Sequence, residues 1–269
     1  MIDLVFFPKN ISGKLFKAYL KSPNHPAKIR IENIIGSIFF KKGIQISNKD
    51  GVIFQLEAND WMTRIIIEEG CYEEKSILLA QTILANGGVF FDIGANFGLF
   101  SCLLSKQPNV KTYSFEPNYN VVGNLIRNIQ INKIDGNTTV VNTAMSDKSR
   151  LVNFFVPQEE NKGTGKYEAA NPGRSNIGIY VSTVSLEDTI NYLAVPHITL
   201  IKIDIEGNEM DVLGAFDFKK IPVYNIIMEF KGHSTISFQD LKSFFESQNY
   251  TVKNIDGNLV EDENDIIED

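Results

Sequence analysis

The stretch Phe90–Phe100, FFDIGANFGLF, carries an apolar strand pattern into a glycine-bearing turn and then directly into a helical pattern. Gly94 and Gly98 permit a tight turn and a close approach of the backbone to a ligand, and Asn96 belongs to the few residue types besides glycine that tolerate a positive φ. Backbone N–H groups and the positive end of the following helix then face the ligand. The stretch therefore predicts a buried strand, a ligand-binding turn and the first crossover of an α/β sheet.

Strand and helix patterns alternate through the rest of the chain. Strand patterns lie at 89–93, 111–115, 139–142, 177–184, 197–203, 223–228 and 250–255. Helical patterns lie between the first strand and residue 104, and at 121–129, 185–192, 206–216 and 238–248. Strands that alternate with helices predict a mostly parallel, doubly wound sheet covered on both faces. The fold class expected is therefore α/β.

The first part of the chain shows a different pattern. Residues 12–20 predict a short basic amphipathic helix, and the runs IRIENIIGSIFF, KGIQI and GVIFQLE between Lys28 and Ile67 predict short strands; residues 73–84 predict a helix. We expect an N-terminal extension at 1–69, a wound-sheet domain at 70–256 and an acidic tail at 257–269.

Ligands of open α/β sheets bind outside the carboxyl ends of the strands. Glu116 ends the second strand, 24 residues after Asp92, where it can accept hydrogen bonds from both hydroxyls of a ribose. The turn reads G-x-x-x-G and lacks the middle glycine of the G-x-G-x-x-G dinucleotide pattern, so no pyrophosphate is implied. A nucleoside without a diphosphate fits, and S-adenosylmethionine is such a ligand. The alternative is a glycine turn with no cofactor role, as in any doubly wound domain.

Six blocks carry a family resemblance: DIGANFG at 92–98, FEP at 115–117, NTAMSD at 142–147, SLEDTI at 185–190, LIKIDIEGNEMDVLGA at 200–215 and IIMEF at 226–230. Together they resemble the FkbM family of S-adenosylmethionine-dependent methyltransferases, over roughly residues 70–252. The resemblance implies a class I, Rossmann-like methyltransferase fold and, usually, O-methylation of hydroxyls on sugars or other natural products.

The resemblance also implies site residues. Asp92, Gly94, Asn96 and Gly98 would form the methionine side of the cofactor site, and Glu116 would hold the ribose. Asn142 and Ala144 lie where such folds usually contact adenine, and Asp204 would lie beside the methyl group.

Several groups could orient or deprotonate an alcohol acceptor, because methyl transfer needs both positioning and removal of a proton. Asp204 and Glu206 lie at the start of one helix, Glu229 ends a very apolar strand, and His233 follows it on the ligand side. Capping of the helix by these acids and by Glu209 is the structural alternative. A set of oxygen ligands for a metal, made of the same four acids, is a second alternative, but we expect no metal.

Composition bounds the remaining possibilities. No apolar run approaches the ~18 residues of a membrane span, and the two cysteines, Cys71 and Cys102, form no disulfide framework. We expect a cytoplasmic protein that acts on a small-molecule or glycan acceptor, without nucleic acid, and we leave homo-oligomerisation open. Trp61 and Tyr72 either border the acceptor pocket or pack in the core, and the loop 157–175 is either a lid or disordered.

Charge is unevenly placed along the chain. Residues 1–49 carry nine Lys or Arg against Asp3 and Glu32, whereas residues 257–269 carry six acids and no base. The two ends are either simply solvated, or the basic front meets an anionic substrate, an anionic surface or the acidic tail of a partner.

The sequence thus predicts an S-adenosylmethionine-dependent O-methyltransferase acting on a saccharide or glycoconjugate. Two alternatives stay open: a non-catalytic module that binds a nucleoside cofactor or serves assembly, and an NAD-dependent oxidoreductase.

Overall fold

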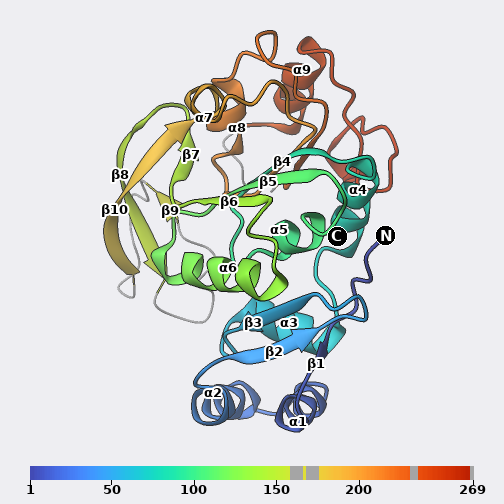
Figure 1. Cartoon of the computed structure of the whole chain (residues 1–269), viewed down its shortest axis with the longest axis vertical. Coiled ribbons are helices and arrows are strands. Elements are labelled where there is room, and N and C mark those ends of the chain that lie inside the picture. The colour runs from blue at the N-terminus through green and yellow to red at the C-terminus, as the bar shows by residue number, and fades with distance from the viewer. Residues whose placement is uncertain (158–165, 168–175, 231–235, 267–269) are drawn as a thin grey trace.

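A computed structural model describes residues 1–157, 166–167, 176–230 and 236–266 (Figure 1). The central sheet has five parallel strands in the order β12-β11-β4-β5-β6. Its strands are β4 (Gly88–Ile93), β5 (Val110–Phe115), β6 (Thr138–Val141), β11 (Leu200–Ile203) and β12 (Ile226–Met228). The chain enters at β4, winds outward to β6 and then returns to the other side of β4. This doubly wound α/β order is the Rossmann-like arrangement of class I methyltransferases, and it places the switch point between β4 and β11.

Neighbouring residues of each central strand face different cores. Phe90 and Leu200 are buried in the cluster that contains α4 (Glu74–Ile83), α5 (Leu99–Leu104) and α6 (Tyr119–Asn132). Phe91 and Ile201 are buried in a second cluster with α7 (Leu186–Leu193), α8 (Glu209–Gly214) and α9 (Phe238–Ser247). Because side chains alternate across a strand, the continuous apolar runs of the sequence follow from a sheet that is buried on both faces.

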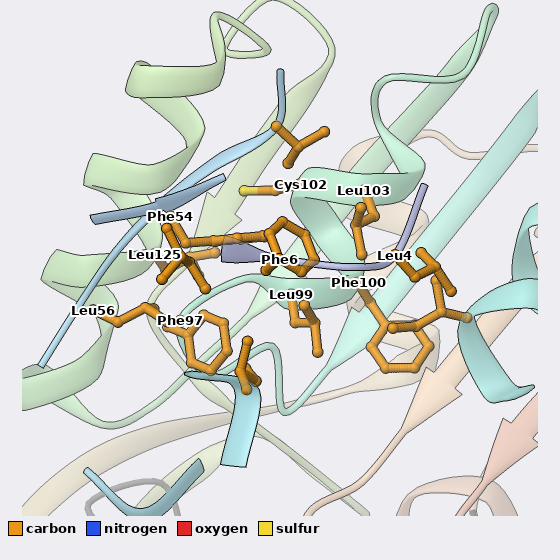
Figure 2. Packing of buried hydrophobic residues seen from close by; sticks show 14 of the residues in the cluster. Leu4, Phe6, Phe54, Leu56, Phe97, Leu99, Phe100, Cys102, Leu103 and Leu125 are labelled. Atoms are coloured by element: carbon orange, nitrogen blue, oxygen red, sulfur yellow. The ribbon is translucent and has the colours of Figure 1, made fainter. Parts of the chain in front are cut away.

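The N-terminal residues form a layer on the first of these cores. This layer contains an antiparallel sheet of β1 (Phe7–Pro8), β2 (Ile44–Ser47) and β3 (Ile53–Leu56), and three helices, α1 (Ile11–Leu20), α2 (Lys28–Phe39) and α3 (Trp61–Glu69). Phe54 of β3 lies edge-on to Phe97, with ring centroids 5.7 Å apart, and Phe6 packs on its other side at 5.2 Å (Figure 2). The layer and the wound sheet therefore share one continuous apolar core.

Two asparagines of α6 complete this junction. Asn128 accepts a hydrogen bond from the Gln55 backbone N–H at 2.8 Å, and Asn132 accepts one from the Ile53 N–H at 2.9 Å and donates one to the Ile53 carbonyl at 2.6 Å. Both side chains are buried. They thus satisfy the free edge of β3, which would otherwise carry unpaired backbone groups inside the protein.

A second sheet, in the order β7-β10-β8-β9, flanks the wound sheet. Its strands are β7 (Ala144–Ser146), β8 (Arg150–Pro157), β9 (Lys166–Tyr167) and β10 (Asn176–Ser185). Most of the loop 157–175 lies outside the described residues, so the choice between lid and disorder stays a prediction.

Two expectations about local structure are wrong. Residues 28–39 form the helix α2 instead of strands, because Glu32, Gly36 and Phe40 supply a buried stripe at a spacing of four. Glu32 in that stripe pairs with Arg64 at 3.4 Å, and because it is acidic, a search for regularly spaced apolar residues does not find the stripe. Packing of this face outweighs the preference of the β-branched residues for strands. Residues 250–255 form no strand; they contribute only a single bridge between Lys253 and Leu259. The helix 238–248 is present as α9, and Ser237 caps it by accepting from the Asp240 N–H.

Candidate active site

A cavity of about 410 Å³ lies at the carboxyl ends of β4, β5, β11 and β12, beside the switch point. Its size is within the range of small-molecule sites, and its position is where wound sheets bind ligands. The lining comes from three parts of the chain: from the wound sheet and its turns, Asp92–Phe97, Leu99, Phe100, Phe115–Pro117, Lys202, Asp204–Glu206 and Glu229; from the second sheet and its approach, Thr143–Met145 and Phe154; and from the N-terminal side, Trp61, Met62, Tyr72 and Glu73.

A polar row crosses three strands at the base of the cavity. Strand register aligns Lys202 of β11 with Asp92 of β4, and Asp92 with Ser114 of β5. The Ser101 hydroxyl of α5 donates to Asp92 Oδ2 at 2.5 Å and lies 2.6 Å from the Ser114 hydroxyl, and the Ser101 N–H donates to the same Oδ2 at 3.0 Å. All four side chains are buried, so this row is fixed by the sheet and by the start of α5.

In the part of the chain that the structure describes, one oxygen of Asp92, a residue that lines the cavity, lacks a hydrogen bond. Within the described residues its Oδ1 atom is buried and has no hydrogen-bond partner. Burial raises the pKa of this carboxyl, and the ammonium of Lys202 and the Ser101 donors oppose that rise only in part. A buried acceptor without a donor is costly, so the site favours a ligand that brings an N–H or O–H group to this atom.

The turn after β4 has the conformation expected from its residues. Gly94 has φ +82°, Asn96 has φ +51° and Gly98 has φ +91°. A Cβ at Gly94 would lie 1.9 Å from the carbonyl oxygen of Asp204, and one at Gly98 would lie 2.6 Å from Leu125. Both glycines are therefore required by close packing as well as by φ, and they allow the turn to lie directly against the end of β11.

Glu116 is buried and lines the cavity beside this turn. Its Oε2 accepts from the Asn96 N–H and its Oε1 from the Asn118 N–H, each at 2.8 Å. Burial raises the pKa of Glu116 to about 7, although these two N–H groups favour the charged form. Each oxygen can accept a second hydrogen bond, so the carboxylate retains acceptor capacity for two hydroxyls.

Of the two residues of NTAMSD that were expected to contact adenine, Asn142 and Ala144, only Ala144 lines the cavity. Thr143 beside it lines the cavity as well. Asn142 is exposed, donates its side-chain N–H to the Glu116 carbonyl at 2.6 Å and is not part of the lining. It positions the end of β5 and does not line the cavity.

The turn after β11 carries two of the predicted acids. Asp204 lies 3.2 Å from the ammonium of Lys202, which also lies over the Phe100 ring at 5.0 Å. Lys202 is buried, and burial alone would lower the pKa of its ammonium. The nearby carboxylates of Asp204, Glu73 and Asp92 outweigh this effect and raise the pKa well above its usual range, so the side chain stays charged. Glu206 lines the cavity with φ +61°, a conformation that is strained for a non-glycine residue.

Glu209 has a supporting role. Its buried carboxylate accepts from the backbone N–H of Ile205 at 3.0 Å and from that of Gly207 at 3.1 Å. It therefore holds the Asp204–Glu206 turn in place from the first residue of α8. The helix has no side-chain cap hydrogen bond among the described residues, so the capping alternative does not describe this contact.

Glu229 lines the cavity just beyond β12, whereas His233 lies outside the described residues. Among the described residues, no group of three or more His, Cys, Asp or Glu side chains is arranged to hold a metal ion. No helix within those residues is long and apolar enough to cross a membrane.

The N-terminal side of the cavity was the hardest part to predict. Trp61, at the start of α3, lies edge-on to Tyr72 with ring centroids 6.3 Å apart, and both line the cavity. Burial and the nearby carboxylates raise the pKa of Tyr72 to about 12, so its hydroxyl keeps its proton at neutral pH. Glu73, with φ +50°, also lines the cavity and had no predicted role. Glu73 lies before the first core strand and outside the motifs that mark the ends of the strands. Its spacing in the sequence therefore does not indicate that it lines the cavity.

Comparisons with known proteins agree with this geometry. A family model described as the methyltransferase FkbM domain matches residues 92–252. A curated relative, the hexuronic acid methyltransferase AglP of Haloferax volcanii, is 26% identical over 125 residues, which cover 46% of this chain and 48% of the relative. The chain thus spans about half the length of that relative.

Solved structures with similarity include a precorrin-6y C5,15-methyltransferase from Geobacter metallireducens, with 18% identity, a TM-score of 0.39 and coverage of 68% of this chain and 74% of that chain. A methyltransferase FkbM from Methylobacillus flagellatus is 18% identical with a TM-score of 0.32, and the match covers 48% of this chain and 29% of that one.

Proposed function

This chain belongs to the FkbM methyltransferase family, and we propose that it transfers the methyl group of S-adenosylmethionine to a hydroxyl of a saccharide or glycoconjugate. The observation that carries the proposal is the pair of buried carboxyl groups, Asp92 of β4 and Glu116 just after β5, which line one cavity beside the switch point.

The residues present fit this cofactor. Asp92 lines the cavity, its buried Oδ1 acceptor lacks a donor within the described residues, and the cofactor carries an ammonium group and hydroxyls. Asp92, with the turn of Gly94, Asn96 and Gly98, would hold the methionine side, and Glu116 would hold the ribose. Ala144 borders the same cavity and would contact the adenine. When bound, S-adenosylmethionine supplies an electrophilic methyl group on a sulfonium.

The acceptor side of the cavity is rich in carboxylates. We assign Asp204, Glu206 and Glu229 to orienting the acceptor hydroxyl, with Asp204 or His233 accepting its proton. Lys202 fixes the Asp204 carboxylate through the 3.2 Å ion pair, and Glu209 fixes its backbone turn. Positioning supplies most of the acceleration in such a displacement, so this rigidity is itself part of the mechanism.

The aromatic residues of the N-terminal layer support a sugar acceptor. Trp61 is about half exposed (48%) and, with Tyr72, presents ring surface to the cavity. Ring faces pack against the C–H groups of a sugar, and the protonated Tyr72 hydroxyl can donate to a sugar oxygen. The printed name of AglP, a hexuronic acid methyltransferase, also supports a sugar.

Cofactor identity is tested by calorimetry with S-adenosylhomocysteine and with NAD. We expect binding of S-adenosylhomocysteine only; affinity for NAD with indifference to S-adenosylhomocysteine would overturn the proposal in favour of an oxidoreductase.

Turnover is tested by incubating cell extracts with the protein and methyl-labelled cofactor and identifying the labelled molecule by mass spectrometry. Asp204→Asn should keep cofactor affinity and lower turnover by about 10²- to 10⁴-fold, whereas Asp135→Asn, an exposed control, should change neither. Full activity of the first variant removes the assigned role of Asp204. Cofactor binding without labelling of any molecule would favour the non-catalytic alternative.

A further inference from the structure

The outer faces of α1 and α2 expose large apolar side chains. The two helices lie together at one end of the molecule, on the far side of the N-terminal sheet from the wound sheet (Figure 1). Their exposed apolar residues, with exposed fractions from 47% to 77%, are Ile11, Leu15, Ile29, Ile34, Ile38 and Phe39. Scattered single apolar residues are normal on a protein surface, but six within two neighbouring helices form a patch.

Helical spacing explains why two pairs of these residues face away from the core. Ile11 and Leu15 are one turn apart on α1, and its buried positions are Gly13, Phe16 and Leu20. Ile34 and Ile38 are one turn apart on α2, whose buried positions are Glu32 and Gly36. A helix on a protein surface normally turns polar residues outward, whereas these two helices also expose large apolar residues.

Exposed bases lie in or directly beside the same two helices in sequence: Lys9, Lys14, Lys21, Arg30, Lys41 and Lys42. The carboxylates of residues 1–49 do not balance them, since Glu32 is buried against Arg64 and Asp3 lies 3.7 Å from Lys49. We call the six apolar residues and these six bases the basic pole.

We propose that the basic pole docks the protein onto a lipid bilayer that carries anionic headgroups. Apolar side chains at the surface insert at the boundary between headgroups and acyl chains, and Lys and Arg beside them attract the anionic lipids.

Other occupants fit the basic pole less well. A second copy in a two-fold dimer would bring two positive surfaces together. A nucleic acid would pair with the bases but leave the isoleucines in water. Within the described part of the acidic C-terminal segment, Glu261 pairs with Lys242 of α9 at 2.6 Å, and Asp265 accepts from the Glu261 N–H at 2.8 Å.

The basic pole is connected to the active site through packed helices. The helix α1 packs against α3, whose first residue, Trp61, lines the cavity. Docking would therefore hold this side of the cavity at a fixed distance from the bilayer.

The test is co-sedimentation of the whole protein with vesicles of phosphatidylcholine alone, or with about one-third phosphatidylglycerol. We expect partition to the anionic vesicles that weakens as salt rises from about 0.1 M to about 1 M, because the Debye length falls from about 10 Å to about 3 Å. Equal partition to both vesicles, or none to either, overturns the proposal.

Charge variants locate the surface. Lys14→Gln with Arg30→Gln should weaken binding about 30-fold, since each base contributes about fivefold. The matched pair Lys219→Gln with Lys253→Gln, at exposed bases far along the chain, should bind as the unchanged protein does. Equal losses in the two pairs would show that net charge alone matters, and the proposal would fail.

Apolar variants separate the bilayer from other anionic partners. Leu15→Gln with Ile38→Gln should weaken vesicle binding by at least about tenfold, whereas Leu151→Gln, at a residue 70% exposed on β8, should not. These positions are exposed and glutamine is a good helix former, so unchanged circular dichroism is the check of folding. An unaffected Leu15 and Ile38 variant, or an oligomer or oligonucleotide complex that this variant disrupts without any vesicle binding, overturns the proposal.

Discussion

Cofactor binding should be linked to a proton held by Glu116. In the free protein, burial raises the pKa of Glu116 to about 7 from its ordinary 4.5, so this carboxyl is about half protonated at neutral pH. Two ribose hydroxyls that donate to it favour its charged form and lower its pKa. If the bound value returns to about 4.5, binding releases about half a proton at pH 7, and affinity falls about 30-fold between pH 8 and pH 5.5.

The assay is isothermal titration calorimetry with S-adenosylhomocysteine at several pH values, in buffers of different ionisation enthalpy. Glu116→Gln should bind more weakly at pH 8 and lose the part of the pH dependence that Glu116 supplies. Asp92, whose pKa burial also raises, would supply the remainder. Glu69→Gln, an exposed control, should behave as the unchanged protein. Equal affinity of the unchanged protein at pH 5.5 and pH 8 would refute the reasoning.

The same group makes a prediction for the protein without cofactor. Because the folded pKa of Glu116 lies above its unfolded value, its contribution to stability is complete below about pH 4.5 and is lost as pH rises through about 7. The loss at pH 8 is up to about 3 kcal/mol. Urea unfolding should therefore show Glu116→Gln to be more stable than the unchanged protein at pH 8 and no more stable at pH 4. The opposite order would show that Glu116 is not desolvated.

Three further substitutions test the scaffold. Gly94→Ala places a Cβ 1.9 Å from the Asp204 carbonyl oxygen at φ +82°, so it should lower the free energy of unfolding by about 3 kcal/mol or more and abolish cofactor binding. The control Gly123→Ala, in open space on α6, should be neutral or stabilise by up to about 1 kcal/mol. Thermal unfolding measures both effects. Asn128→Leu leaves a backbone N–H of β3 and a buried carbonyl unpaired and should destabilise by about 2 to 4 kcal/mol in urea unfolding; a loss below about 0.5 kcal/mol would mean that these groups find other partners. Glu209→Gln keeps an oxygen for the turn it holds and should lower turnover much less than Glu209→Ala, with cofactor affinity constant in both; equal activities would remove its positioning role.

The central sheet could be predicted because residues close together in the sequence determine each strand and the turn that follows it. The run into Gly94, Asn96 and Gly98 fixes a strand, a left-handed turn and a helix within eleven residues, and all three φ values are positive in the structure. Glu116 likewise lines the cavity because its strand is the next one in sequence and lies beside the first in space. Chain order and spatial order agree here, so spacing alone indicates the contact.

Prediction from spacing stops where contacts cross the chain. Trp61 reaches the cavity from the N-terminal layer, whose attachment depends on Asn128 and Asn132 of α6, about 70 residues later. Asparagine in a helix face is ordinarily a neutral or unfavourable choice, and its value appears only when the edge of β3 lies against it. A sequence pattern records neither partner.

Lys202 shows how an acid-rich cavity can fold at all. The carboxyl groups of Asp92, Asp204 and Glu73 all act on its ammonium, which is buried over the Phe100 ring. Without a cation there, three carboxyl groups near one desolvated point would repel each other, and protons would bind to them instead. The lysine sits inside the IKID block and reads as one polar residue in an apolar strand. In three dimensions it is the charge that allows the carboxylates of three chain segments to share one site, so the acidity of the cavity and the presence of Lys202 are a single structural requirement.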